Sequence, residues 1–568
     1  MTMKLHNERG AALIISLFIV TVLLGLSSVF VLRSIYESNI AQRELDMAKS
    51  FYYAEGGSKA ALQGLDVLIN DYMLSTVNGT NPSTLVSQTV GYVAGNDGIG
   101  FLYDFVENGG TPALTLNGAI AEYTQTASMG SGQYQYDIEI SEKTNPVIIT
   151  ADSWDFPYNY RIVARGTEKS TDKDVLLSGD FTVRVQRDNF AKYALFTNDQ
   201  TLPNGTNVWF TDKTNFAGPL HTNGRYNFAL NPSGTFEGSI DQVEQLARFY
   251  NSGSPILLDA EFNGTEDIPT FNSGFNRDVS PITLASATQQ QDLVDQAQGG
   301  AAIAGNGIYV PNNGASLTGG IYVEGDSNIT MGVDGSNNAV YNITQGGSTR
   351  IITVDRTNNQ TTVNDPSSGV TVYSGTPDGI DGVGTVIYVN GNINSLGGTV
   401  QQNTAMTISS NNDIIITDNV QYQNYTPAVG TPGQAGYIPP NAVGQDNLLG
   451  LVSWNGDVRI GTSAPDDISV HGTVLAKSGI LQVDSYNDTG VGGRGTATML
   501  GGVISDYYGA FGLFNGSTGT QVAGYGRNFV FDERMASGNA PPYFPSLNTF
   551  IAFTNDITDK MIWQEGDT

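Results

Sequence analysis

The chain opens with a long apolar run, and this run constrains the fold more than any other feature. Residues Ala11–Leu32 read AALIISLFIVTVLLGLSSVFVL and contain no charged side chain. A helix over these residues is roughly 33 Å long, which is enough to cross the hydrocarbon core of a bilayer. Lys4, His6 and Arg9 precede the run, and a positive flank keeps an N-terminus cytoplasmic. We therefore expect a single pass through an inner membrane, with the rest of the chain outside it, in the periplasm or at the cell surface.

The apolar run differs from a cleaved secretory signal. Such a signal has a shorter apolar region that ends in a small-residue cleavage site, whereas here residues 33–37 (RSIYE) continue the helical character. Farther on, Ala41, Leu45, Ala48 and Tyr52 recur at i, i+4, i+7 and i+11, so they form one apolar stripe on a helix. The sequence therefore predicts a single helix over residues 11–70, weakened at Gly56-Gly57.

The residues around this run carry a family resemblance. The sequence ERGAAL at residues 8–13, followed by the apolar run, resembles the leader and helix of type IV pilins and pseudopilins. The motif FYYAEGG at residues 51–57 most closely resembles the PilX-type minor pilins. The resemblance implies a leader over residues 1–10, cleavage by prepilin peptidase between Gly10 and Ala11, and methylation of the new amino terminus. A glycine without Cβ suits a peptide that enters a protease site in extended form.

The resemblance also implies that the helix packs laterally against other pilins. The small residues Gly25, Ser27 and Ser28 allow close helix approach. Most major pilins carry a glutamate five residues into the mature chain, which neutralises the amino-terminal charge of a neighbouring subunit, but this chain has Ile15 there. Two interpretations remain: a subunit at a filament tip or in an initiating complex, or an anchored protein that never polymerises. The expected packing residues are Leu13, Gly25, Ala41, Leu45, Ala48 and Tyr52.

Composition restricts what the remaining chain can do. The 26 Lys and Arg against 55 Asp and Glu give a formal charge of −29, which repels a phosphate backbone and argues against nucleic acid as a partner. The chain has no cysteine, so neither a disulfide framework nor a thiolate metal site is available. Charged residues make up only 14 % of the chain while glycine reaches 68 residues, which favours a mainly β fold with many tight turns.

Residues 71–190 are expected to form a pilin-like β-region. Residues 134–140 alternate apolar and polar side chains, as a half-buried strand does, and residues 147–149 add a short strand. Tyr160–Arg165 and Val175–Val185 flank a polar run, which predicts a hairpin. A long helix followed by antiparallel strands matches pilin architecture.

Residues 191–300 are expected to form a separate β-rich domain. Residues 193–224 resemble an uncharacterised domain found after PilX-type helices in other bacterial surface proteins. We expect two short helices on it, at residues 241–249 and 287–297. The sequence shows no second ligand or nucleophile at a useful spacing from His221, so we expect this histidine to stabilise a turn and not to bind a ligand.

Residues 301–520 break into short β-branched runs separated by glycine and asparagine. The sequence GIYV at residues 307–310 returns at residues 320–323, and a near relative occurs at residues 386–389. Such spacing suits a β-helix of stacked coils, with β-sandwich modules as the alternative. The asparagine-glycine pairs at residues 390–392 and 455–456 are expected to supply positive φ at corners. Further runs occur at residues 351–354, 413–417 and 479–483, and residues 521–568 are expected to cap the last coil.

The chain shows little sign of catalytic chemistry. Residues 490–495 fit GxGxxG as a string, but they lie outside any βαβ unit and are expected to form a turn. The three histidines, His6, His221 and His471, fit no HExxH motif, and no GxSxG elbow occurs. A β-helix lyase or glycosidase would need convergent side chains, for which Arg459, Asp466, Asp467 and Lys477 are available. The weak candidates for a structural calcium site are Asp378, Asp381, Asp484 and Asp488.

The sequence therefore favours a non-catalytic, minor-pilin-like component of a type IV pilus or a related filament or secretion system. Its role would be in assembly, at the tip, or in adhesion and surface contact. The expected partners are other pilins, the inner membrane, prepilin peptidase, and a surface polysaccharide or a host or abiotic surface, without a cofactor. Two alternatives stay open: a membrane-anchored carbohydrate-active β-helix enzyme, and a structural cell-envelope protein unrelated to pili.

Overall fold

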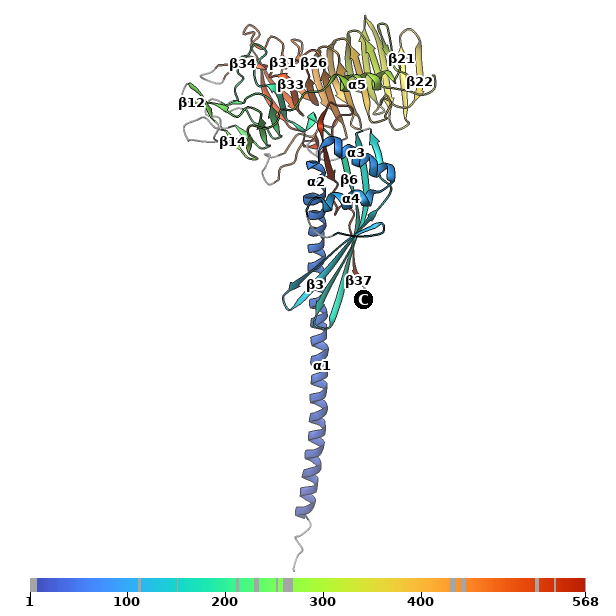
Figure 1. The fold of residues 1–568 in the computed structure, drawn as a ribbon, viewed down its shortest axis with the longest axis vertical. Helices are drawn as coiled ribbons and strands as arrows, with labels where there is room; N and C mark the ends of the chain where they lie inside the picture. Colours follow the sequence, from blue (N-terminus) through green and yellow to red (C-terminus); the bar gives the residue numbers. More distant parts are fainter. Residues whose placement is uncertain are drawn as a thin grey trace, which may run out of the picture. The chain divides into compact units, whose positions relative to one another are not determined.

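The computed structural model divides the chain into two compact units (Figure 1). The first unit comprises residues 1–186 and 550–568, and the second comprises residues 187–549. The mainly β class with a long N-terminal helix is confirmed. The structure describes residues 8–110, 114–150, 152–210, 214–228, 234–251, 254–258, 269–429, 436–440, 446–515, 520–535 and 538–566.

The first unit begins with helix α1 (Glu8–Val67), which runs without a break through Gly56-Gly57. It continues as a π-helical segment (Leu68–Leu74) and a short helix α2 (Ser75–Gly79). The predicted helix over residues 11–70 is therefore correct, and residues 1–7 of the predicted leader lie outside the described residues.

The expectation of a β-region from residue 71 is wrong as far as residue 107. Helices α3 (Pro82–Gly95) and α4 (Gly98–Glu107) occupy this stretch. Local capping residues explain them: the Asn81 side chain accepts a hydrogen bond from the Ser83 amide, and Asn96 ends α3 at a φ of 52°. The Asp97 side chain caps α4 through the Gly100 amide.

An antiparallel sheet follows, in the strand order β1-β2-β3-β5-β6-β36, with β4 beside β5 and β37 beside β6. The predicted hairpin is confirmed: β5 and β6 pair along their length around a turn in which Lys169 has a φ of 55°. The strands are β1 (Thr115–Asn117), β2 (Ile120–Met129), β3 (Gly132–Glu142), β4 (Val147–Thr150), β5 (Ser153–Glu168), β6 (Thr171–Asn189), β36 (Ser546–Thr554) and β37 (Ile562–Gly566).

The second unit is an insertion between two neighbouring strands of this sheet, because the chain leaves after β6 and returns as β36. The returning segment is bound firmly within the first unit. The Ala552 amide donates to Asn78 Oδ1 at 2.6 Å, and the Tyr160 hydroxyl donates to the Ile557 carbonyl at 2.8 Å. The C-terminal cap expected over residues 521–568 is therefore wrong for its second half, which completes the first sheet instead.

Helix α1 lies very close to the sheet. Except for Leu65, its buried face consists of small or short side chains. A Cβ on Gly166 of β5 would collide with the Ser50 carbonyl oxygen and the Ala54 nitrogen. This contact needs a glycine because backbone touches backbone. The buried positions of α1 along this face are Asp46, Ser50, Ala54, Gly57, Ser58, Ala61 and Leu65.

The second unit contains two long sheets of mostly parallel strands. In the part of the chain that the structure describes, the first has the order β15-β11-β8-β7-β33-β30-β27-β25-β23-β17-β16. Its strands are β7 (Leu195–Asp199), β8 (Leu220–Thr222), β11 (Ile240–Gln242), β15 (Phe275–Asn276), β16 (Gly307–Tyr309), β17 (Ile321–Glu324), β23 (Thr385–Asn390), β25 (Ala405–Ser410), β27 (Leu448–Ser453), β30 (Thr473–Ala476) and β33 (Val503–Tyr507).

The second long sheet has the order β22-β21-β20-β19-β18-β24-β26-β29-β32-β35-β34, with β28 and β31 beside β26. Its strands are β18 (Ser327–Val333), β19 (Ala339–Gln345), β20 (Ser348–Asp355), β21 (Gln360–Asp365), β22 (Gly369–Ser374), β24 (Ile393–Val400), β26 (Ile414–Tyr422), β28 (Val458–Ile460), β29 (Ser469–His471), β31 (Leu481–Val483), β32 (Gly493–Leu500), β34 (Gly512–Phe514) and β35 (Gln521–Val530). Short strands β9 (Asn227–Phe228), β10 (Thr235–Phe236), β12 (Ala247–Asn251), β13 (Ser254–Leu258) and β14 (Thr270–Phe271) complete the unit.

A ladder of buried apolar side chains crosses the first long sheet. One residue of each strand stacks on its partner in the next, as the parallel register requires. The parallel pairing is the one expected between stacked coils, and we call each segment that adds one strand to this ladder a coil. The β-helix itself stays a prediction. The ladder consists of Phe275, Ile240, Leu220, Leu195, Val503, Val474, Leu451, Ile408, Ile387 and Ile321.

The chain enters this ladder in its middle. Strand β7 pairs with β8 on one side and with β33, about three hundred residues later, on the other. Residues 191–300 therefore share one sheet with residues 301–520, and the separate domain that we expected there is wrong. Residues 351–354 lie in β20, in the antiparallel meander β18 to β22 and not in a stacked coil.

The corners of the coils are joined by side-chain hydrogen bonds from one coil to the next. Asp326 accepts from the Asn392 amide at 2.8 Å, and Asn392 accepts from the Asp413 amide at 3.2 Å. Asp413 in turn accepts from the Asp457 amide at 2.9 Å, and Asp457 accepts from the Ile480 amide at 3.0 Å. Each carboxylate or amide thus satisfies a backbone donor that the turn would leave unpaired.

The predicted positive φ at two of these corners is wrong. Gly391 and Gly456 are absent from the positive-φ residues of the described chain. Instead, a Cβ on Gly391 would collide with the backbone of Gly325 and Asp326, and one on Gly456 would collide with Asp413. Glycine is required there because neighbouring coils approach closely.

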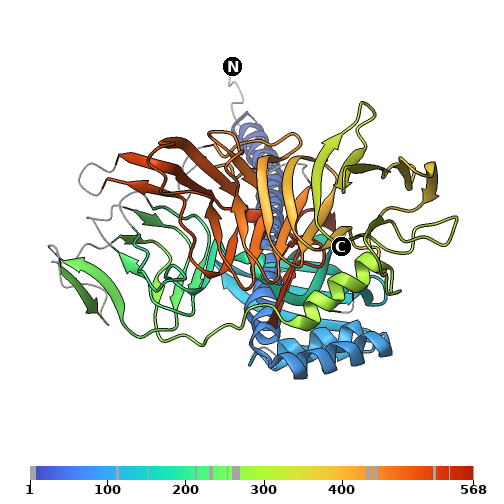
Figure 2. The same ribbon diagram turned by 90° about the horizontal axis from the view of Figure 1, so that it is seen from above.

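One of the two expected helices of this unit is present. Helix α5 (Ala287–Gln298) has a capping box between Ser286 and Gln289, and it packs on β17 and β23 (Figure 2). The other, at residues 241–249, is wrong. That stretch holds parts of β11 and β12, because Ala247 and Phe249 are buried alternately with the more exposed Arg248.

We predict that Gly166→Ala destabilises the first unit by roughly 3 kcal/mol, because its methyl group has no room between β5 and α1. Gly79→Ala is the matched control, since no atom lies within 4 Å of its added Cβ. Chemical denaturation of both variants, followed by circular dichroism, measures the difference. Equal stability of the two variants would contradict this close contact.

We also predict that the second unit loses stability in acid through His471. Burial lowers the pKa of His471 to about 4 from 6.5, and its Nδ1 accepts from the Tyr422 amide at 3.0 Å. Below pH 6.5 the unfolded chain binds a proton that the folded chain refuses, so stability falls as the pH drops toward about 4. The loss is roughly 3 kcal/mol.

The variant His471→Asn retains an acceptor for the Tyr422 amide but does not titrate. Denaturation at several pH values should show a shallower decline between pH 6.5 and pH 4 for the variant than for the natural protein. Identical slopes would mean that His471 is protonated in the folded state as readily as in the unfolded state.

Candidate functional site

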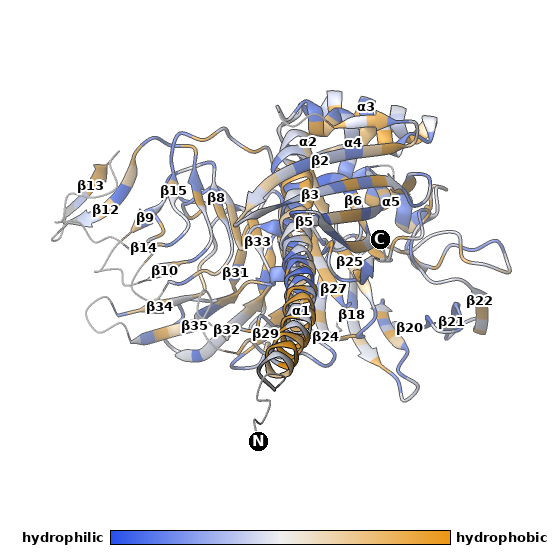
Figure 3. Ribbon diagram, turned by 90° about the horizontal axis from the view of Figure 1, so that it is seen from below, coloured by the Kyte–Doolittle hydropathy of each residue, from blue (hydrophilic) through white to orange (hydrophobic). Residues whose placement is uncertain are grey.

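The N-terminal part of α1 is bare and apolar. Among the described residues, the structure has one helix that is long and apolar enough to cross a membrane, and its most apolar part is not buried against the rest of the protein. Leu13 is 71 % exposed, and an added Cβ on Gly25 would meet no atom within 4 Å. In Figure 3 the N-terminal turns of α1 are coloured mostly as hydrophobic. Such a surface is unstable in water and needs lipid or protein around it.

The predicted stripe lies on the side of α1 that faces away from the sheet. Ala41, Leu45, Ala48 and Tyr52 are all exposed, Tyr52 by 64 %. At about 100° per residue they fall within roughly 60° of one another and roughly opposite the buried face. One face of α1 therefore binds the unit's own sheet, and the other is free. The role of the stripe as a contact for other subunits stays a prediction.

Charged side chains hold α1 to the end of the β5–β6 hairpin. Lys169 contacts both carboxylate oxygens of Asp46 at 3.0 Å, and this hydrogen bond lowers the pKa of Asp46. Lys49 lies 3.6 Å from Glu168, whose carboxylate also accepts from Ser131. From Gly10 to the residue before Asp46 the helix is exposed throughout, so this cluster marks where its supported part begins.

The predicted processing site lies at the start of this bare segment. Gly10 and Ala11 are helical and exposed, while residues 1–7 lie outside the described residues. Ile15, in the place of the glutamate of major pilins, is 58 % exposed. Cleavage between Gly10 and Ala11 stays a prediction, and so does lateral packing through Leu13 and Gly25.

The weak calcium candidates are not brought together. Asp378 accepts from Thr376, Asp381 from Gln296, and Asp488 from the Gly490 amide. Asp484 lies 3.2 Å from Arg459. In the described part of the chain, no group of three or more histidine, cysteine, aspartate or glutamate side chains is arranged to hold a metal ion.

The residues considered for polysaccharide cleavage have separate partners. Arg459 bridges Asp413 at 2.8 Å and Asp484 at 3.2 Å, whereas Asp466 pairs with Arg494 at 3.0 Å. Asp467 accepts from the Thr496 amide. These contacts join neighbouring coils to one another.

Two smaller sequence features have structural roles. The turn expected for the GxGxxG string at residues 490–495 is present at residues 490 and 491, but residues 493–495 already belong to β32. Gly492 and Gly495 have positive φ. His221 is buried in β8, stacks on Phe196 with ring centroids 5.1 Å apart, and contacts Asn223 Oδ1 at 3.0 Å. Burial lowers the pKa of His221. These contacts fit the predicted turn-stabilising role.

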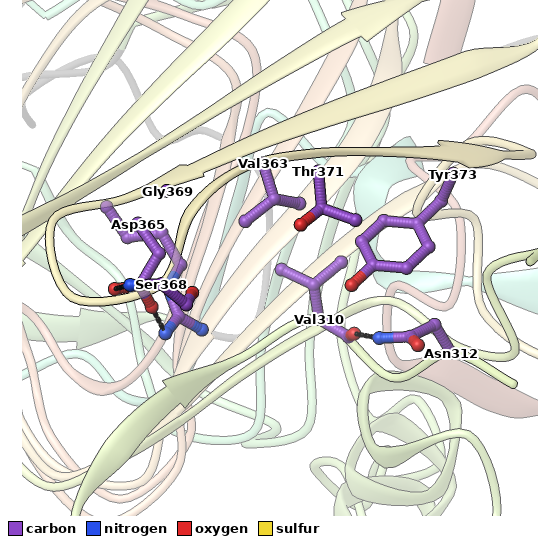
Figure 4. Close-up of a pocket in the computed structure, with 9 residues that line it drawn as sticks. Val310, Asn312, Val363, Asp365, Ser368, Gly369, Thr371 and Tyr373 are labelled. Carbon is purple, nitrogen blue, oxygen red and sulfur yellow. Dashed lines mark hydrogen bonds and ion pairs between the residues drawn. The ribbon is translucent and has the colours of Figure 1, made fainter. Parts of the chain in front are cut away.

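A cavity of about 210 Å³ lies beside the meander of the second unit. Figure 4 shows Thr371 and Tyr373 across from Val310 and Asn312. The one basic side chain of its lining, Arg350, is already paired with Asp365 and with the Ile308 carbonyl. The side chains of Arg350, Asp365 and Asn312 in this lining thus already have hydrogen-bond partners.

Three comparisons relate the chain to known proteins. The model of a domain of unknown function (DUF4900) matches residues 155–243, which run from β5 to just beyond β11. No curated protein matches the chain. Among solved structures, the chain is similar to the competence-associated pilin ComZ from Thermus thermophilus, at 11 % identity and a TM-score of 0.29, over 92 % of this chain and 98 % of that chain.

We predict that a charge on the free stripe leaves the first unit folded. Ala48→Glu should change its unfolding free energy by no more than about 0.5 kcal/mol, because Ala48 is exposed. Ala54→Glu, six residues along and fully buried, should cost roughly 3 kcal/mol or more. Thermal denaturation of the full chain in detergent measures both. A large loss in Ala48→Glu would show that the stripe supports the unit's own fold.

Proposed function

We propose that the chain is a non-catalytic, pilin-like component of a type IV filament or related secretion system. Helix α1 holds it in the membrane and packs against other pilin helices, and the second unit supplies a β-rich surface for contact. One observation carries this proposal: the same helix binds its own antiparallel sheet through one face and leaves a membrane-length segment and an apolar stripe bare.

A role at the tip or in an initiating complex is supported by two features. Ile15 cannot neutralise a neighbouring amino terminus, and an uncompensated ion in lipid costs several kcal/mol. The inserted unit, residues 187–549, is also larger than the unit that carries it. A unit of this size is easier to accommodate in one subunit at the end of a filament than in every subunit along it.

The enzyme alternative has less support. A cavity of about 510 Å³ contains Asp457, and burial raises the pKa of this carboxyl group. Asp457 is nevertheless a corner residue of the coil ladder, and no second carboxylate lines that cavity among the described residues. Release of reducing sugar from polysaccharides by the purified chain would favour the enzyme instead.

The processing step provides the first test. Mass spectrometry of the protein from its native host should find a mature N-terminus at methylated Ala11. Gly10→Val should retain Met1, because a β-branched side chain does not fit where the protease needs a residue without Cβ. An uncleaved N-terminus in the natural protein would leave a simple membrane anchor.

The second test concerns the packing of α1 against other pilin helices and uses the variant Ala48→Glu. Ala48→Glu should remain in the membrane but should no longer co-purify with pilus components. Asn39→Glu is the matched control, because Asn39 is also exposed but lies roughly opposite the stripe. Equal co-purification of the two variants would refute packing through this stripe.

A further inference from the structure

Two cavities adjoin on the surface of the second unit, at the strand where the chain enters the long sheet. One of about 390 Å³ and one of about 510 Å³ are both lined by Tyr507 at the end of β33. The turn after β7 also lines both: Thr201 and Asn207 border the smaller, and Leu202 borders the larger. The turn is closed by a hydrogen bond from the Leu202 amide to the Thr206 carbonyl at 2.9 Å. Together they form one groove.

The smaller cavity is lined by planar polar side chains of balanced charge. Arg225 and Arg248 stand against Asp199 and Glu244, and Arg225 pairs with Glu244 at 2.9 Å. Burial lowers the pKa of Arg248, and the positive charge of the neighbouring Arg225 lowers it further. A pocket without net charge, in a chain of formal charge −29, suits a neutral ligand better than a polyanion.

Several donors and acceptors of this cavity are held in place before any ligand arrives. Asn223 donates to Asn198 at 2.9 Å and to the Ile282 carbonyl at 2.7 Å, and Asn198 donates to Asp506 at 2.9 Å. Asn227 accepts from Arg248 at 3.0 Å. Side chains fixed in this way lose little freedom when they bind a ligand.

One polar atom in the cavity lining lacks a partner. Nε of Arg225 is buried and makes no hydrogen bond among the described residues. A buried donor without an acceptor is costly, and such atoms are rare in folded proteins.

The larger cavity supplies a different surface. Tyr486 and Tyr507 are half-buried there, beside Leu202 and Pro203, and Gln482 adds an amide. Exposed tyrosines offer an apolar face and a polar edge at little entropic cost. The groove therefore combines flat aromatic rings with paired planar donors and acceptors.

We propose that this groove binds a neutral polysaccharide. Adjacent hydroxyl groups of a sugar match the paired oxygens and nitrogens of Asp199, Arg225, Glu244 and Arg248, and the apolar face of the next sugar ring lies on Tyr507. The inference deepens the proposed function, on which it rests, by naming the class of surface that the second unit contacts.

The test uses the full-length protein in detergent micelles and an array of neutral oligosaccharides with α- and β-linked hexoses and N-acetylhexosamines. Oligogalacturonides and a single-stranded oligonucleotide are included as anionic probes. We expect binding to one or more neutral glycans. Arg248→Gln and Tyr507→Ala should each weaken it by about tenfold or more, the factor that 1.4 kcal/mol represents.

Matched controls separate the groove from general effects. Arg161→Gln and Tyr36→Ala remove an exposed arginine and an exposed tyrosine of the first unit, and both should bind as the natural protein does. Thermal denaturation checks that each groove variant is folded. Binding only to the anionic probes, no binding to any neutral glycan, or unchanged binding by both groove variants would overturn the proposal. None of these results depends on a filament, so the processed N-terminus tests the proposed function separately.

Discussion

The close contact between α1 and β5 is the constraint on which the rest of the first unit depends. At Gly166 the strand approaches the helix so closely that even a methyl group would meet backbone atoms of Ser50 and Ala54. Small residues near Ser50 and Ala54 on the buried face allow this approach, and the stripe that contains Leu45 and Tyr52 lies on the opposite face. The close packing of one face of α1 on β5 thus stabilises the first unit and leaves the opposite face of α1 exposed.

The second unit depends on another kind of constraint, the stacking of parallel strands. Along the ladder each strand buries an apolar side chain on its neighbour, and the corners from Asp326 to Ile480 are also joined through Asp or Asn side chains. Because the parallel register is the same along the ladder, strands that are distant in the chain can stack as neighbours. Strand β7 can therefore lie against β33, and the chain can enter in the middle and leave close to where it entered. A unit inserted between two adjacent strands of another sheet needs its two ends to lie close together.

The proposed binding groove lies where the chain enters the first long sheet of the second unit. Residues after β7, residues after β8 and the end of β33 meet where early and late coils adjoin, so Arg225 and Tyr507 come to line one cavity. The asparagines of the lining are held by hydrogen bonds to Asn198 of β7 and to the carbonyls of Val208 and Ile282. A surface of this kind serves contact by shape and hydrogen bonding, which is the role that we propose for the second unit.

The sequence by itself determined the features that depend on local pattern. An uncharged run and a stripe with helical spacing predicted α1 and its exposed apolar residues, alternation predicted the β5–β6 hairpin, and short β-branched runs predicted stacked strands. It failed at residues 241–249, where a short polar segment suits a helix or a strand equally well, and it missed the caps Asn81 and Asp97 of α3 and α4. Only the tertiary structure decided that residues 550–568 complete the first sheet, that residues 191–300 join the coils, and that Arg225 lies near Tyr507. The reason is physical: a strand offers the same backbone hydrogen bonds to every partner, so the choice of partner rests on side-chain packing between residues that are distant in the chain.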